Sequence, residues 1–154
     1  KPMALPTARA HLMAEYGGLI VPNIEADDTL GIYGSRDADT VIWSDDKDLK
    51  TIPAKHLFED GIVEIDEKEA DYWFFYQTLV GDSTDNYKGC PTIGDKKARA
   101  ILDKDCSWEA VVAAFEKQGL SEAVALEQAR LARILRDGEY DFETNEVTLW
   151  QPED

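Results

Sequence analysis

The spacing of hydrophobic and polar residues divides the start of the chain into short elements of alternating type. Apolar residues recur at helical spacing over residues 6–16, and Gly17 and Gly18 end that pattern. A short apolar run at residues 19–21 predicts a buried strand, and residues 26–33 again have helical spacing. The chain is therefore expected to open with a helix, a strand and a second helix.

Short β-type runs follow. Residues 40–43 predict a strand, and residues 57–58 and 62–65 predict a hairpin. Residues 66–79 have the pattern of an amphipathic helix that begins at the capping residue Asp66. We expect its inward side chains to be Ala70, Trp73, Phe74 and Leu79. Its aromatic run spans every face of the helix, so core packing is favoured over stacking on nucleic-acid bases.

The second half of the chain has mainly helical spacing. Ser107 precedes an apolar helical pattern that ends at Gly119, and residues 121–135 predict a longer helix. Its three arginines recur at i, i+3 spacing, which favours pairing with neighbouring acids over contact with phosphate. Residues 146–150 predict a terminal strand or an extended tail that packs Trp150.

Residues 81–102 combine paired acids, glycines and a lysine-rich helix start. Asp82 and Asp85 are three residues apart, so both can face one hard cation. A glycine-punctuated turn follows, and then a helix opens with Asp95, Lys96 and Lys97. Lysines in a first turn oppose the helix dipole, and a bound polyanion would explain them. The alternative is an acidic loop followed by an ordinary helical corner.

Charge changes this picture. The 154 residues are 44% hydrophobic, enough for one domain or a compact pair with a real core, yet 32 acids against 16 bases give a net charge of −16. Such a surface repels nucleic acid unless the acids hold divalent cations or a basic surface lies on another part of the protein. Cys90 and Cys106 lack metal-ligand spacing and predict free thiols. No apolar run reaches the roughly 20 residues of a membrane helix, so we expect a cytoplasmic protein without a membrane partner.

Three acidic clusters stand where predicted elements begin or end. At one edge of a sheet, their carboxylates would repel one another strongly unless cations neutralised them. Oxygen ligands, without histidine or cysteine at ligand spacing, select Mg²⁺ or Mn²⁺ over zinc. A pair of such cations suits in-line displacement at phosphorus. The clustered acids are Glu25, Asp27, Asp28, Asp46, Asp48, Asp82 and Asp85.

In order along the chain, these motifs resemble the structure-specific 5′-nucleases. That family includes flap endonucleases, the nuclease domain of bacterial DNA polymerase I and phage-encoded 5′→3′ exonucleases. The resemblance covers nearly the whole chain and is carried by residues 25–28, 44–49, 81–86 and 89–98. Similarity to the phage-encoded group lies in residues 48–53, 70–73, 132–135 and 149–150.

The resemblance implies a fold and a set of roles. Residues 1–80 would be the C-terminal part of a PIN-like α/β nuclease core with a parallel-type sheet, and residues 81–154 a helix-hairpin-helix region. All seven acids would be metal ligands for two Mg²⁺ or Mn²⁺ ions, and Asp27, Asp28, Asp46 and Asp48 would also be catalytic. Gly89, Gly94, Lys96 and Lys97 would grip the DNA backbone, with a K⁺ at the hairpin.

Three departures accompany it. Thr92 stands where a glycine is common, and Asp45 is an extra acid that we interpret as a non-ligand. The family's earlier strand with its aspartate, and its arched helical segment, are not in these residues.

The expected activity is that of a metal-dependent 5′→3′ exonuclease or flap endonuclease. Its partners would be DNA with a 5′ end or flap and an upstream N-terminal segment of the same enzyme, and the fragment alone would cut poorly. Two alternatives are a non-catalytic helix-hairpin-helix module and an acidic protein that binds cations structurally. The seven acids argue against the first, because concentrated negative charge does not help a DNA-binding module, and Lys96 and Lys97 argue against the second.

Overall fold

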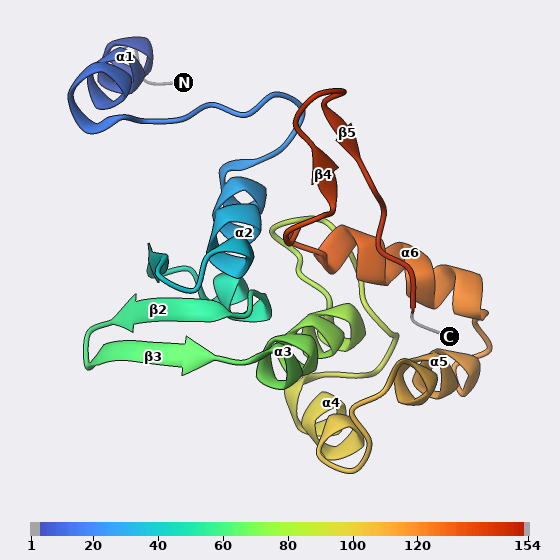
Figure 1. Cartoon of the computed structure of the whole chain (residues 1–154). Helices are drawn as coiled ribbons and strands as arrows, with labels where there is room; N and C mark the ends of the chain where they lie inside the picture. Colours follow the sequence, from blue (N-terminus) through green and yellow to red (C-terminus); the bar gives the residue numbers. More distant parts are fainter. Residues whose placement is uncertain (1–3, 153–154) are drawn as a thin grey trace.

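The computed structural model describes residues 4–152 (Figure 1). Helices and strands alternate in the first half, and helices dominate the second half. In chain order the elements are α1 (Leu5–Tyr16), α2 (Ala26–Arg36), β1 (Val41–Trp43), the 3-10 helix η1 (Lys47–Thr51), β2 (Ala54–Phe58), β3 (Gly61–Ile65), α3 (Glu67–Val80), α4 (Asp95–Leu102), α5 (Trp108–Glu116), α6 (Glu122–Ala132), β4 (Tyr140–Asp141) and β5 (Glu146–Val147).

The main sheet is small and mixed, with strand order β1-β2-β3. β1 lies parallel to β2, with Ile42 opposite His56, and β2 pairs antiparallel with β3, with Phe58 opposite Gly61. The predicted strand at residues 40–43 and the predicted hairpin are therefore confirmed. The parallel β1–β2 pair places the turn after β1 at the edge of the sheet beside η1.

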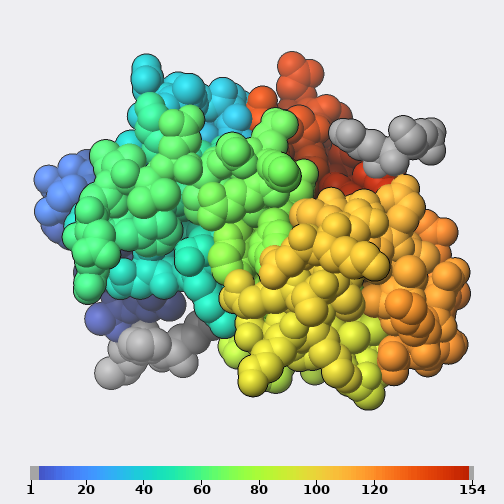
Figure 2. Space-filling model, turned by 90° about the horizontal axis from the view of Figure 1, so that it is seen from below, coloured from blue at the N-terminus to red at the C-terminus, as the bar shows by residue number. Residues whose placement is uncertain are grey.

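The largest core lies among α3, α4, α5 and α6 (Figure 1). Phe74 and Leu79 of α3 and Phe115 of α5 are almost completely buried there. Trp150 joins them from the tail, with its ring centroid 5.0 Å from that of Phe74 and 5.2 Å from that of Trp108. The aromatic run of α3 thus belongs to the core as predicted, except that Trp73 is half-buried and Phe75 is buried in its place. In the space-filling view from below, the yellow residues that include α4 form part of the surface, with green residues on one side and orange residues on the other (Figure 2).

One predicted strand is absent from the structure. Residues 19–21 form no strand, and Leu19 and Ile20 are 60% and 62% exposed. Within residues 4–152 neither sheet includes this run, so its apolar character has no partner strand to pack against. The helix at residues 6–16 is confirmed as α1, but none of its described residues is buried.

The last long helix is shorter than predicted. It ends at Ala132 rather than Leu135, because Arg133 takes an extended backbone with ψ 115°. The chain then turns toward α2, where the Leu135 backbone N–H donates to Asp28 Oδ1 at 3.0 Å. Tertiary hydrogen bonds thus replace the last helical turn that the sequence pattern favours. By contrast, the helix predicted at residues 26–33 is longer than expected and ends at Arg36.

Cys90 and Cys106 are free, as predicted. Within the described part of the chain, no helix combines the length and the apolar character that crossing a bilayer requires.

Candidate metal and nucleic-acid site

The first acidic cluster opens α2. Glu25 is the N-cap residue with an extended backbone, and its N–H donates to Asp28 Oδ2 at 3.1 Å in a capping box. The other oxygen of Asp28 accepts the Leu135 N–H. Both carboxylate oxygens of Asp28 therefore accept hydrogen bonds from backbone N–H groups. Asp27 is half-buried, and within the described residues its carboxylate accepts no such hydrogen bond.

The second cluster follows β1 and forms the start of η1. Asp46 caps η1, and its Oδ1 accepts the Asp48 N–H at 2.9 Å. The Asp48 carbonyl accepts the hydroxyl of Thr51, so its backbone is fixed at both ends. The Asp48 side chain accepts Gln77 Nε2 of α3 at 2.9 Å. These contacts bring the turn after β1 against the C-terminal end of α3.

The third cluster lies in a tight loop after α3. Gly81 has a φ of 75°, and Asp82 and Tyr87 exchange two backbone hydrogen bonds of 3.0 Å. A Cβ on Gly81 would come within 2.4 Å of the Lys88 carbonyl carbon, so only glycine permits this approach. The loop places Asp82 and Asp85 beside Asp48, and one ligand oxygen from each of these three residues lies within 4.8 Å of the others.

Together the clusters form a pocket of about 370 Å³, which we call the acid pocket. Its carboxylates come from all three clusters, and Gln77 and Tyr87 stand among them. The acids and these two residues that line it are Glu25, Asp27, Asp28, Asp46, Asp48, Asp85, Gln77 and Tyr87. Asp82 joins through its approach to Asp48 and Asp85. The structure thus brings together all seven predicted acids, although their roles as ligands and catalysts stay predictions.

The electrostatics of the acid pocket favour cations. Burial, followed by the nearby charge of Asp46, raises the pKa of both Asp27 and Asp48. Burial and the surrounding carboxylates likewise raise the pKa of Tyr87. Asp82 differs, because the hydrogen bond from the Thr84 N–H lowers the pKa of its carboxyl. Oxygen-only donors that repel one another fit Mg²⁺ or Mn²⁺.

The predicted DNA-gripping residues lie in the turn that leads into α4. Gly89 has a φ of 62°, and its N–H and that of Lys88 both donate to Gln128 Oε1 of α6. Gly94 is the N-cap of α4. Thr92, the residue that departs from glycine, takes a left-handed φ of 65°. The turn therefore keeps a conformation that favours glycine, in spite of the threonine.

Lys96 and Lys97 are exposed in the first turn of α4. Lys97 Nζ donates to the Thr92 carbonyl at 2.8 Å, and the Thr92 hydroxyl donates to Gln118. Lys97 thus braces the turn, while Lys96 projects from the same helix start.

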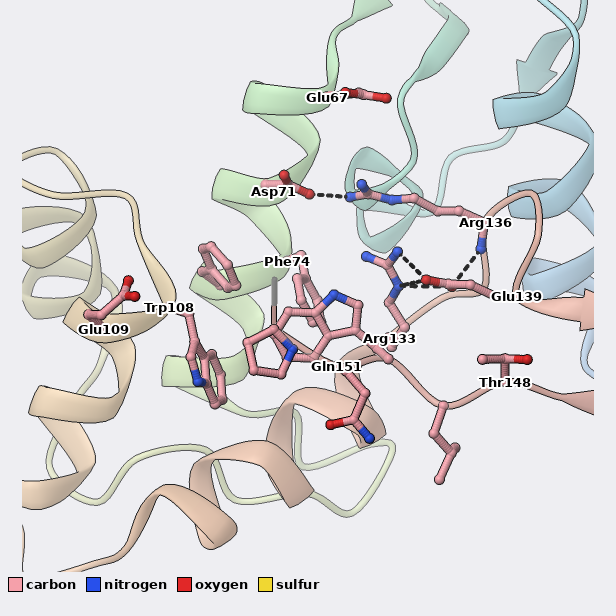
Figure 3. Close-up of a pocket in the computed structure, with 14 residues that line it drawn as sticks. Glu67, Asp71, Phe74, Trp108, Glu109, Arg133, Arg136, Glu139, Thr148 and Gln151 are labelled. Carbon is pink, nitrogen blue, oxygen red and sulfur yellow. Dashed lines mark hydrogen bonds and ion pairs between the residues drawn. The ribbon is translucent and has the colours of Figure 1, made fainter. Parts of the chain in front are cut away.

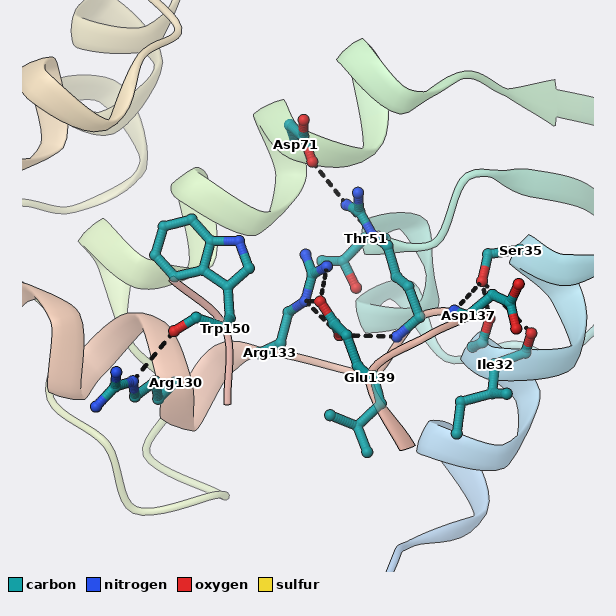
Figure 4. A network of polar contacts seen from close by, with 12 residues as sticks. Ile32, Ser35, Thr51, Asp71, Arg130, Arg133, Asp137, Glu139 and Trp150 are labelled. Carbon is teal, nitrogen blue, oxygen red and sulfur yellow. Dashed lines mark hydrogen bonds and ion pairs between the residues drawn. The ribbon is translucent and has the colours of Figure 1, made fainter. Parts of the chain in front are cut away.

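Residues 133–139, between α6 and β4, tie the acid-bearing elements together (Figure 4). Arg136 donates to the Thr51 carbonyl at 2.8 Å and pairs with Asp71 of α3 at 2.8 Å, and the Asp137 N–H donates to the hydroxyl of Ser35 in α2. Arg133 pairs with Glu139. Arg133 and Arg136 pair with acids outside α6, whereas Arg130 donates to the Trp150 carbonyl at 3.2 Å, so the predicted i, i+3 pairing along one helix is wrong. Nothing in their spacing indicates these partners, and the sequence analysis likewise missed Gln77 and Tyr87.

A second cavity, of about 570 Å³, lies on the other side of Arg133 (Figure 3). Phe74, Trp108 and Trp150 supply its aromatic wall, and the Arg133–Glu139 pair supplies a polar one. Its acids belong to ion pairs or to solvent-facing helix surfaces, and the three predicted clusters lie in the acid pocket instead.

No protein-family model matches the chain. Among curated proteins it is 29% identical to an exodeoxyribonuclease of Enterobacteria phage T3 and 30% identical to an exonuclease of Escherichia phage T7. Each match covers 85% of this chain and 56% or 57% of the relative, so the chain spans about half the length of these relatives. A 5′-3′ exonuclease of Halalkalibacterium halodurans is 30% identical over 54% of the chain and 34% of that protein. With the three acidic motifs in one pocket and relatives of this kind along most of its length, the chain belongs to the 5′-nuclease family.

Proposed function

We propose that this chain carries the metal site of a 5′→3′ exonuclease that hydrolyses DNA and also acts on flaps. The observation that supports this most directly is the approach of Asp48, Asp82 and Asp85, whose ligand oxygens lie within 4.8 Å of one another. These residues come from two segments that the sequence separates by more than a whole helix. A fold with no use for a cation would gain nothing from their repulsion.

The residues divide into groups by their position in the acid pocket. Asp48, Asp82 and Asp85 would hold one divalent cation. A second divalent cation would be held by three other acids that line the pocket, Glu25, Asp27 and Asp46. When bound, such cations generate hydroxide from water, orient the phosphate and stabilise the leaving oxygen. Asp28 is a weaker candidate ligand than the sequence suggests, because both of its oxygens already accept backbone N–H groups.

For DNA contact we propose the turn between α3 and α4 as a helix-hairpin-helix element. Gly89 and Gly94 would let phosphate approach the backbone, and Lys96 and Lys97 would supply positive charge at the start of α4. A K⁺ held by carbonyls of this turn also stays a proposal. The Thr92 carbonyl already accepts a hydrogen bond from Lys97 Nζ, so a K⁺ at that carbonyl would compete with the lysine.

The test compares carboxylates inside and outside the acid pocket. In the complete enzyme, Asp46→Asn and Asp48→Asn should each abolish 5′ cutting and leave DNA binding largely intact, because removing negative charge cannot weaken the protein's own attraction to phosphate. Asp45→Asn is the matched control, since Asp45 is exposed in the same turn. We expect it to cut as the wild type does. Cutting by the Asp46 and Asp48 variants at the wild-type rate would show that the pocket is assigned wrongly.

Direct metal binding separates this proposal from a non-catalytic DNA-binding module. Mn²⁺ at millimolar concentration should raise the melting temperature of the wild-type chain and of Asp45→Asn by mass action, and should raise that of Asp48→Asn much less. A non-catalytic module would melt at the same temperature with and without Mn²⁺ at pH 7.

A further inference from the structure

Gln77 is an amide in the wall of the acid pocket, among carboxylates. It lies in the last turn of α3, half-buried, and its Nε2 is 2.9 Å from Asp48 Oδ1. Because a carboxylate only accepts hydrogen bonds, the amide must present its nitrogen to Asp48 and not its oxygen. The contact joins residues 29 positions apart.

The rest of Asp48 is already fixed. Its N–H donates to Asp46, and its carbonyl accepts the Thr51 hydroxyl, so the backbone of η1 is held at this point. What remains free is the rotation of the carboxylate itself. Repulsion from Asp82 and Asp85 would turn that carboxylate away from them in the absence of a cation.

Gln77 also begins the turn that carries the other two acids. Its carbonyl accepts the Gly81 N–H at 2.8 Å, which ends α3, and the positive φ of Gly81 directs the chain into Asp82. One residue thus contacts Asp48 through its side chain and the start of the Asp82–Asp85 loop through its backbone.

We propose that Gln77 is a positioning residue that holds one oxygen of Asp48 and directs the other toward Asp82 and Asp85. This inference rests on the proposed function, because it assigns Gln77 a use only if those three carboxylates share a cation. Hydrogen bonds of this kind fix the orientation of metal-binding side chains, and their loss typically weakens metal affinity by about 10- to 100-fold.

The experiment measures Mn²⁺ binding to this chain by electron paramagnetic resonance of the free ion, without DNA. Gln77→Met keeps the length and packing of the side chain but removes its donor, and Gln151→Met makes the same change at an exposed glutamine of the tail. We expect Gln77→Met to raise the Kd for Mn²⁺ by about 10- to 100-fold and Gln151→Met to leave it unchanged. The melting temperature of metal-free Gln77→Met should stay close to that of the wild type.

The possible outcomes are distinct. If the wild type binds no Mn²⁺, the proposed function fails and the role of Gln77 fails with it. If the wild type binds Mn²⁺ and Gln77→Met binds it equally well, only the positioning role is overturned. A lower melting temperature with unchanged affinity would make Gln77 a purely structural residue. Should Gln77→Met not fold, Gln77→Asn takes its place: its amide is one methylene too short for Asp48, so wild-type affinity there overturns the proposal.

Discussion

The carboxyl of Asp27 has a raised pKa because it is partly buried and because Asp46, Glu25 and Asp28 lie around it. A pKa that is higher in the folded state favours folding below the unfolded pKa of about 3.9, and this contribution is lost as the pH rises through the folded pKa. The ionised Asp27 therefore lowers the free energy of unfolding of the metal-free protein at neutral pH.

Asp27→Asn should accordingly raise the melting temperature at pH 7 in metal-free buffer. The gain in free energy of unfolding should be less than about 1 kcal/mol, because solvent screens the charges. The gain should shrink as the pH falls and disappear below the unfolded pKa. Saturating Mn²⁺ should reverse the order, because the variant lacks a ligand. Thermal melts at several pH values, with chelator and with Mn²⁺, test all three statements, and a variant less stable than the wild type at pH 7 with chelator contradicts the first.

Single residues also show how far the sequence predicts this site. The seven acids could be identified because they form three clusters, each next to the beginning or end of an element that the hydrophobic pattern predicts. Gln77 and Tyr87 could not, since their partners are set by how α3 packs on η1 and by the fold of the loop after Gly81. Residue type and spacing do not predict such contacts.

At the scale of elements, the start of α4 is where the two lysines differ. Lys96 is exposed, whereas Lys97 also holds the Thr92 carbonyl. Replacing both with alanine should weaken duplex binding equally for all sequences and make its salt dependence shallower, because phosphate contacts carry no base information.

The single variants separate the two effects. Lys96→Ala should reduce the salt slope by about 1 with little change in stability. Lys97→Ala should in addition lower the melting temperature, because the Thr92 carbonyl loses its donor. Lys68→Ala is the control, because Lys68 is an exposed lysine in the first turn of α3, at the end of that helix away from the turn that leads into α4. This variant should bind DNA as the wild type does. Binding isotherms at several salt concentrations measure the slopes, and an unchanged slope in the double variant would move the DNA site elsewhere.

Elements that pack on their neighbours were predictable, and those that depend on a distant partner were not. The β2–β3 hairpin and the capped helices α3 and α5 are local structures, with Asp66 and Ser107 as the observed caps. Residues 19–21 have the composition of a strand, but a strand exists only where another can pair with it. Likewise α6 ends early because Asp28, more than a hundred residues away, accepts the Leu135 N–H.

At the scale of the whole molecule, the net negative charge opposes the DNA binding that the proposed function requires. Seven of the 32 acids gather at the acid pocket, where cations would neutralise them. A net charge of −16 still repels DNA over distances near the Debye length of about 10 Å at 0.1 M salt. A nuclease needs positive surface to offset this repulsion. Lys96 and Lys97 at the start of α4 are exposed and could supply part of it, whereas Arg133 and Arg136 are engaged within the fold.

We therefore expect these 154 residues alone to cut DNA poorly, even with Mg²⁺. The relatives extend well beyond the matched region, and the family resemblance implies an upstream carboxylate and a basic segment that captures the 5′ end. The experiment incubates a 5′-labelled duplex or flap with this chain, with and without a separately produced upstream segment, and follows release of the label. Cutting should require both parts and be lost with Asp48→Asn. Robust 5′ cutting by the chain alone would mean that its seven acids suffice, and that the negative charge outside the acid pocket does not limit the approach of DNA.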